Sequence, residues 1–156
     1  MLVPADLAQP VTDPALDEME IYINGMTFWK PVQLSKPRSR SKGSPRSDKG
    51  SPTGKHLARG ALTLWEFLEG VHEYLMIGVS GKEYKAVPPA QQHAVSSAFN
   101  ARCVAAGKDA EVVRAKGLKR VDFLGEYTQF ATLLQSKENP HMWLLHTRPA
   151  TLRPST

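Results

Sequence analysis

The residues from Lys116 to Leu133 contain the densest β-forming pattern in the chain. Two runs rich in β-branched and aromatic side chains, Leu118–Leu124 and Glu126–Leu133, are separated by Gly125. Runs of this kind around a glycine are typical of two strands joined by a sharp turn. We therefore expect a hairpin at the centre of a small sheet, with the helices that precede it in the chain covering one face.

The expected hairpin brings two charged side chains together. Residues two apart on a strand share a face, so Arg120 and Asp122 should project to the same side. They could form a polar pocket for a ligand. They could also form ion pairs, with each other or with a helix, that fix the packing of the sheet. We favour the structural ion pair, because buried charges are generally paired and such pairs also perturb pKa values. Arg120 and Asp122 are still the candidate polar site.

A second hairpin is predicted near the N-terminus. Residues 1–18 contain several prolines and are expected to be an extended lead-in. In Glu20–Trp29, Asn24-Gly25 separates two β-prone runs, which indicates a type I′ turn because both central residues need a positive φ. Pro31 cannot donate to a strand ladder, so it should end the second strand or place it at an edge.

The segment at about 35–60 has a different composition. Serine, glycine, proline and cationic residues dominate it, and such a segment buries too little apolar surface to offset chain entropy. Eight basic residues and one acidic residue lie between Lys36 and Arg59, so this part carries +7 and the rest of the chain −2. We predict a long disordered basic loop inside one domain.

Helix signals follow the loop. Thr63 and Glu66 have the spacing of a capping box and predict a helix that runs to about Met76. Ser80 and Glu83 repeat this spacing and predict one short extra turn. Helices are also expected over 90–105, after two prolines, and over 110–116, and a final buried strand over 142–147. In the first of these helices an apolar stripe is formed by Ala94, Val95, Ala98, Phe99 and Arg102.

These elements predict an α+β fold. The sheet should be small and mostly antiparallel, with four or five strands covered by two or three helices. A chain of 156 residues is long enough for one domain with a real core. The domain is expected over 19–149, interrupted by the loop, with a frayed tail at 150–156.

The order of the segments resembles a fungal family catalogued as domain of unknown function 6699. The resemblance is carried by the capped helix TLWEFLEGVHEYL, the turn SGKEY, the helical FNARC, the stretch KGLKRVDFLGEYTQFATL and the closing MWLLHTRP. In that family a Gly-x-x-Arg-Val-Asp-x-Leu strand leads into a second strand ending in Phe, and a Trp-containing strand closes the domain. The resemblance covers about 61–149 and implies a compact α+β domain of fungal origin. It brings no substrate and no catalytic residue with it.

Few residues are suited to catalysis or metal binding. Cys103, the only cysteine, lies on a predicted apolar helix face without an activating base, which favours a small buried side chain over a nucleophile. The five histidines show no paired ligand spacing, so we expect no metal and no cofactor. We interpret the three tryptophans mainly as core residues, with an aromatic binding face as the alternative. The histidines and tryptophans are His56, His72, His93, His141, His146, Trp29, Trp65 and Trp143.

The expected location is intracellular, cytoplasmic or nuclear. The first residues lack the basic and apolar regions of a secretory signal, and no apolar run approaches the ~20 residues of a membrane span. A single cysteine also suits a reducing compartment.

The leading hypothesis for function is a protein-interaction module without enzymatic activity, tuned by the basic loop. Ser44 and Ser51 each precede a proline and are candidate phosphorylation sites, where a phosphate would add nearly two negative charges. The candidate basic contacts are Lys36, Arg38, Arg40, Lys42 and Arg46. An inert solvated spacer is the alternative for the loop.

Two other functions stay open. The first is an auxiliary nucleic-acid-binding protein that uses the basic loop, although the loop lacks interleaved aromatic residues and the rest of the chain has no positive net charge. The second is an enzyme with a pocket around Arg120 and Asp122. An unknown protein is the expected partner.

Overall fold

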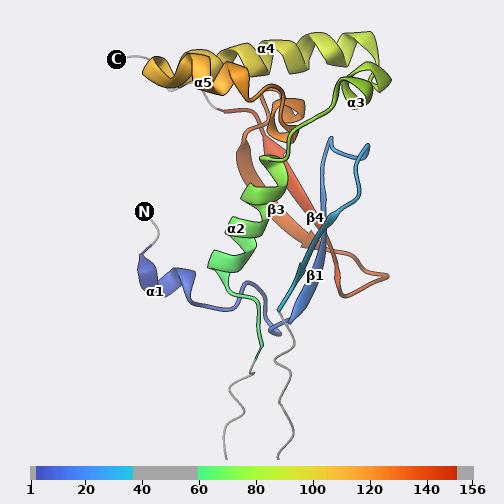
Figure 1. Cartoon of the computed structure of the whole chain (residues 1–156). Helices are drawn as coiled ribbons and strands as arrows, with labels where there is room; N and C mark the ends of the chain where they lie inside the picture. The colour runs from blue at the N-terminus through green and yellow to red at the C-terminus, as the bar shows by residue number, and fades with distance from the viewer. Residues whose placement is uncertain (1–2, 37–59, 151–156) are drawn as a thin grey trace, which may run out of the picture.

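The computed structural model of the protein describes residues 3–36 and 60–150 (Figure 1). The helices are α1 Pro4–Leu7, α2 Leu64–Leu75, α3 Gly81–Ala86, α4 Pro89–Ala105 and α5 Ala110–Ala115, with 3-10 turns η1 Gly107–Asp109 and η2 Arg120–Leu124. The strands are β1 Glu18–Ile23, β2 Val32–Ser35, β3 Gln129–Gln135 and β4 Met142–Arg148. The α+β class is therefore confirmed.

Four strands form one sheet in the order β2-β1-β4-β3. β1 pairs with β2 and β3 pairs with β4 in antiparallel fashion, whereas β1 and β4 run parallel. The sheet is thus mostly antiparallel, as expected, and its two central strands come from opposite ends of the described chain.

The main core lies between the sheet and α2. On β1 every second side chain is buried, namely Met19, Ile21 and Ile23, which follows from the two-residue period of a strand. Phe67 and Val71 of α2 pack against this face. Burial of large apolar side chains of this kind contributes about 1.5–3 kcal/mol each. Figure 1 shows α2 beside the sheet, with α4 and α5 lying across one end of the molecule.

The start of α2 forms as the sequence indicates. The Thr63 hydroxyl accepts the Glu66 amide at 3.3 Å, and the Glu66 carboxylate accepts the Thr63 amide at 2.8 Å. The next turns bring α2 close to β2 at Gly70, where a Cβ would meet the Leu34 side chain. An alanine at this point would therefore force the end of the Leu34 side chain to move.

The N-terminal hairpin forms with a different second strand. β1 pairs with β2 at Val32–Ser35, and the predicted strand over residues 26–29 is absent. Met26 is buried in the core, and the Trp29 ring packs edge-on against Phe123 at 4.6 Å between centroids. Burial of Met26 and packing of the partly buried Trp29 accompany a loop over residues 24–31 in place of a strand. Pro31 consequently precedes the second strand.

The central hairpin prediction is half wrong. Glu126–Leu133 contributes to β3, but the predicted strand over Leu118–Leu124 does not form. Arg120–Leu124 instead make the 3-10 turn η2, and Lys119 makes a single bridge to Gly78. Three consecutive residues, Asp122, Phe123 and Leu124, are buried there. Successive side chains of a strand point to opposite faces, so a strand covered on one face would bury only every second residue. Arg120 and Asp122 therefore do not share a strand face.

The other helix predictions are confirmed. α3 begins at a Ser80–Glu83 capping box, α4 begins at its second proline, and α5 ends before Gly117, which has a φ of 70°. The predicted loop at 35–60 and the tail at 150–156 lie almost wholly outside the described residues. Within the described ranges no helix has the length and apolar character to cross a bilayer.

Candidate cleft beside helix α4

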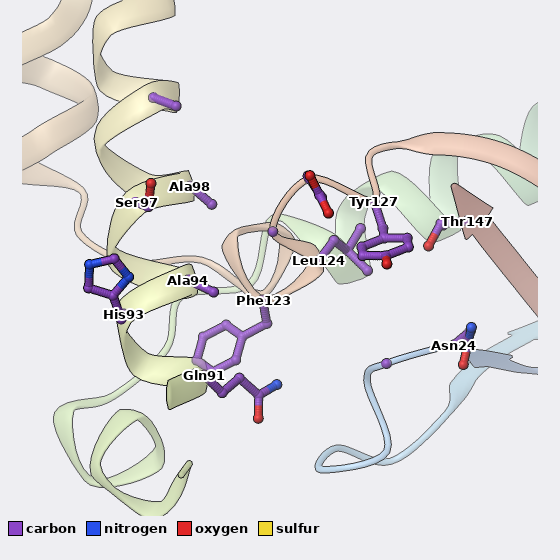
Figure 2. A pocket seen from close by; sticks show the side chains of 14 residues that line it. Asn24, Gln91, His93, Ala94, Ser97, Ala98, Phe123, Leu124, Tyr127 and Thr147 are labelled. Atoms are coloured by element: carbon purple, nitrogen blue, oxygen red, sulfur yellow. The ribbon is translucent and has the colours of Figure 1, made fainter. Parts of the chain in front are cut away.

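A cleft of about 740 Å³ lies between α4, the η2–β3 connection and the turn after β1 (Figure 2). One wall is the small-residue side of α4, which includes Ala94, Ser97, Ala98 and Ala101. Figure 2 shows Ala94 and Ala98 directed toward Phe123, with His93 on the other flank of the helix. Small side chains leave room for another chain to approach α4 closely.

The floor of the cleft is apolar and fixed. Phe123 and Leu124 line it and are each 7% exposed. Phe123 also packs with Val87 and Val95 in a second small core, so the floor is held by α4 itself. Tyr127, which is 48% exposed, stands at the opposite side of the cleft. An apolar floor with an exposed aromatic rim suits an apolar side chain of a ligand.

The rim of the cleft is polar, with Glu126 as its one fully charged side chain. Asn24 and Thr147 come from the end of the sheet, and Gln91 comes from the first turn of α4. Uncharged amide and hydroxyl groups at such positions can donate to and accept from a peptide backbone. The rim therefore suits an uncharged polar segment better than a strongly charged ligand.

No two side chains that line the cleft are joined as an activated nucleophile and its base would be. His93, Ser97, Glu126 and Tyr127 have chemistry that could serve acid–base or nucleophilic catalysis, and no side-chain hydrogen bond joins any two of them in the described part of the chain. An activated nucleophile needs a base within hydrogen-bond reach that is itself oriented by a third group.

Asp122 lies outside the cleft lining and pairs with α4. Its carboxylate receives two hydrogen bonds of 2.8 Å from the Nε and Nη2 atoms of Arg102, and a third of 2.8 Å from the Lys119 amide. Arg102 Nη2 also donates to the Gly117 carbonyl at 3.1 Å. The bonds to Asp122 raise the pKa of the Arg102 guanidinium. Asp122 is only 2% exposed. Because the pair joins η2 to α4, it holds Phe123 and Leu124 of η2 in place as the floor of the cleft.

Arg120 points to a different region. Its guanidinium lies 4.5 Å from the centroid of Tyr74 and 5.4 Å from that of Trp29, in cation–π geometry. Trp29 also donates to Glu83 Oε1 at 3.1 Å. Hydrogen bonds from the side chain and amide of Ser80, and then from Trp29, lower the pKa of the Glu83 carboxyl to about 2. Arg120 and Asp122, predicted as one site, thus belong to two separate clusters.

The remaining candidates are dispersed. Cys103 is fully buried in α4, and Trp65 is 53% exposed on α2. Within residues 3–36 and 60–150 no three His, Cys, Asp or Glu side chains gather in a way that could hold a metal ion. Of the candidate basic contacts, Lys36 pairs with Glu66 at 3.1 Å. Arg38, Arg40, Lys42 and Arg46, and both Ser44 and Ser51, lie outside the described residues.

The sequence predictions missed the cleft, and they allowed an ion pair of Asp122 with a helix without naming Arg102 as the partner. A signal for the partner exists, since Arg102 is the one charged member of the apolar stripe on α4 and a charge at such a position needs a counterion. No comparable signal marked the cleft, because its walls come from three separate segments of the chain.

These features define an α+β domain with a four-stranded mixed sheet and a cleft beneath its longest helix. The model of a family of unknown function, DUF6699, matches residues 2–141, and the chain belongs to this family. No curated protein and no solved structure matched the chain.

Proposed function

We propose that the protein is a protein-interaction module, and that the cleft beside α4 receives a short segment of a partner protein. The observation that carries the proposal is the chemistry of this cleft: an apolar floor at Phe123 and Leu124, a wall of small side chains, and a largely uncharged polar rim. An apolar anchor residue of the partner would contact the floor, and its backbone would hydrogen-bond with the rim.

Site-specific photo-crosslinking tests the proposal. A benzophenone amino acid at Ala98, inside the cleft, should give a discrete cross-linked product in cells, which the additional change Phe123→Ala should reduce. The same probe at Ala105 is the matched control, because Ala105 is exposed on α4 and is not a lining residue. Identical products at both positions would contradict binding in the cleft.

The basic loop is the proposed regulatory part of the same module. Phosphates at Ser44 and Ser51 would add about −3 to −4 in total and so offset roughly half of its charge of +7, which would change which partners it attracts. The proposal includes an intracellular location, cytoplasmic or nuclear, and the fungal origin that the family resemblance implies.

Auxiliary nucleic-acid binding is the second candidate, supported by the concentration of positive charge in one segment. Fluorescence anisotropy with labelled DNA and RNA at several salt concentrations tests it. The control variant replaces residues 37–59 with a Gly/Ser linker of equal length and keeps Lys36, which pairs with Glu66. Salt-sensitive binding that the linker variant loses would support this function, and equal behaviour of both proteins would contradict it.

An enzyme with a pocket around Arg120 and Asp122 has less support. Neither residue is among the lining residues of the cleft, and the Asp122 carboxylate already accepts three hydrogen bonds.

A further inference from the structure

We propose that the open face of the sheet binds a second copy of this chain. The two sheet faces would meet with their strands antiparallel, around a two-fold axis that runs across the strands. This inference is independent of the cleft beside α4. It rests on the distribution of apolar and charged side chains over the open face, meaning the face opposite α2.

An apolar row crosses the middle of the open face. Register pairs Tyr22 with Leu144 and Leu144 with Leu134, so these three side chains lie side by side on β1, β4 and β3. They are 37%, 38% and 51% exposed, respectively. In the described part of the chain, α2 is the helix that packs against the sheet. The residues before and after the row on each strand point toward α2, so the row points away from it and is not covered by it. A continuous exposed apolar row of this kind marks an interaction surface.

The row is also part of a hollow in the surface. Tyr22, Leu134, Met142 and Leu144 line one part of a depression of about 490 Å³. Its other part is lined by Trp29 and by Tyr74 of α2, so the depression reaches beyond the open face.

The charges on the open face have opposite signs on the two sides of the row. Glu18 and Glu20 precede Tyr22 on β1, whereas His146 and Arg148 follow Leu144 on β4. Because β1 and β4 run parallel, Glu18 and Glu20 lie toward one end of the face, and the Arg148 cation lies toward the other end. His141 lies 3.8 Å from Glu18 near the acidic end. Lys36 follows Ser35, the strand partner of Glu18, and pairs with Glu66 at 3.1 Å.

This polarity selects the partner and its orientation. The proposed two-fold axis runs along the apolar row. Rotation about this axis places the row of one chain against the row of its copy. It also places the acidic end of each chain opposite the basic end of the other. The face is therefore complementary to itself, as an isologous dimer interface requires. Rim charges of this kind contribute mainly to orientation and specificity, while the apolar row supplies most of the affinity.

Sedimentation velocity over a wide range of concentration tests the dimer. The wild-type chain should form a dimer, and Leu144→Lys should abolish it because a charge would enter the apolar row. Val104→Lys is the matched control: Val104 is 76% exposed on α4, so this variant should dimerise as the wild type does. A wild type that stays monomeric throughout, or a Leu144→Lys dimer of unchanged affinity, would overturn the proposal.

Charge reversal separates the orientation from damage to the fold. Glu18→Arg and Arg148→Glu should each weaken self-association by about tenfold, since each places like charges opposite one another. In an equimolar mixture of the two variants the opposite charges face each other again, so a heterodimer should form with the wild-type affinity. If the mixture associates no better than the separate variants, the antiparallel face-to-face arrangement is wrong.

Discussion

At the scale of single residues, Asp122 is the one charged side chain that is buried in the described part of the chain. It accepts three hydrogen bonds and is 2% exposed, and its partner Arg102 approaches it with two parallel donors. Paired bonds of this geometry are stronger and more specific than a single contact. The pair holds η2 against α4 and therefore keeps Phe123 in place as the floor of the cleft.

Removal of the Asp122 carboxylate should be costly. Asp122→Ala leaves the half-buried Arg102 guanidinium without its counterion, and we expect a loss of about 3 kcal/mol in the free energy of unfolding. Urea denaturation followed by circular dichroism measures this loss. Glu111→Ala is the control, since it removes the exposed Arg114–Glu111 pair and should cost less than about 0.5 kcal/mol. Equal losses in both variants would contradict the structural role of Asp122.

Glu83 makes stability depend on acid pH. Its pKa is about 2 in the folded protein and 4.5 ordinarily, so its contribution is complete above pH 4.5 and declines as the pH falls from there toward 2. Glu83→Gln should therefore lose less stability than the wild type over this pH interval, as measured by thermal unfolding at a series of pH values.

Glu69→Gln provides the comparison for Glu83. Glu69 is exposed on α2 and has no side-chain hydrogen bond among the described residues, so its variant should keep the wild-type pH dependence. A Glu83→Gln variant with the same pH dependence as Glu69→Gln would show that the bonds from Ser80 and Trp29 do not lower this pKa in solution.

At the scale of elements, the contact between α2 and β2 depends on one glycine. A methyl group at Gly70 would overlap the Leu34 side chain, so Gly70→Ala should reduce the free energy of unfolding by about 1–3 kcal/mol in spite of alanine's higher helix propensity. Gly78→Ala is the control, because a Cβ there meets no atom within 4 Å. Chemical denaturation compares the two variants, and a stabilised Gly70→Ala protein would contradict the close approach.

Helices could be predicted from the sequence better than strands. The capping boxes at Thr63 and Ser80 and the proline start of α4 are local signals, and each began a helix where expected. Residues 26–29 and 118–124 have β-prone composition, but the burial of Met26, Trp29 and Phe123 by distant segments decides their conformation. The cleft depends on the same long-range packing, so its residues could not be found from local patterns.

At the scale of the whole molecule, β4 connects the two halves of the sheet. Leu145 on β4 is 2% exposed and contacts the core from a position between β1 and β3. Leu145→Ala should therefore lower the free energy of unfolding by about 3 kcal/mol, measured by urea denaturation. Val104→Ala, on the exposed side of α4, should change it by less than about 0.5 kcal/mol. Similar effects at both positions would contradict a central place for β4.

The parallel pairing of β1 with β4 also has a consequence for biosynthesis. More than 100 positions separate Glu20 from its partner Met142, so the ribosome has made almost the whole domain before β1 can acquire its second neighbour. Until then the nascent chain presents an unpaired apolar strand edge, the kind of surface that chaperones bind. The sheet can be completed only after β4 has been synthesised, and contacts this distant in sequence make that step slow.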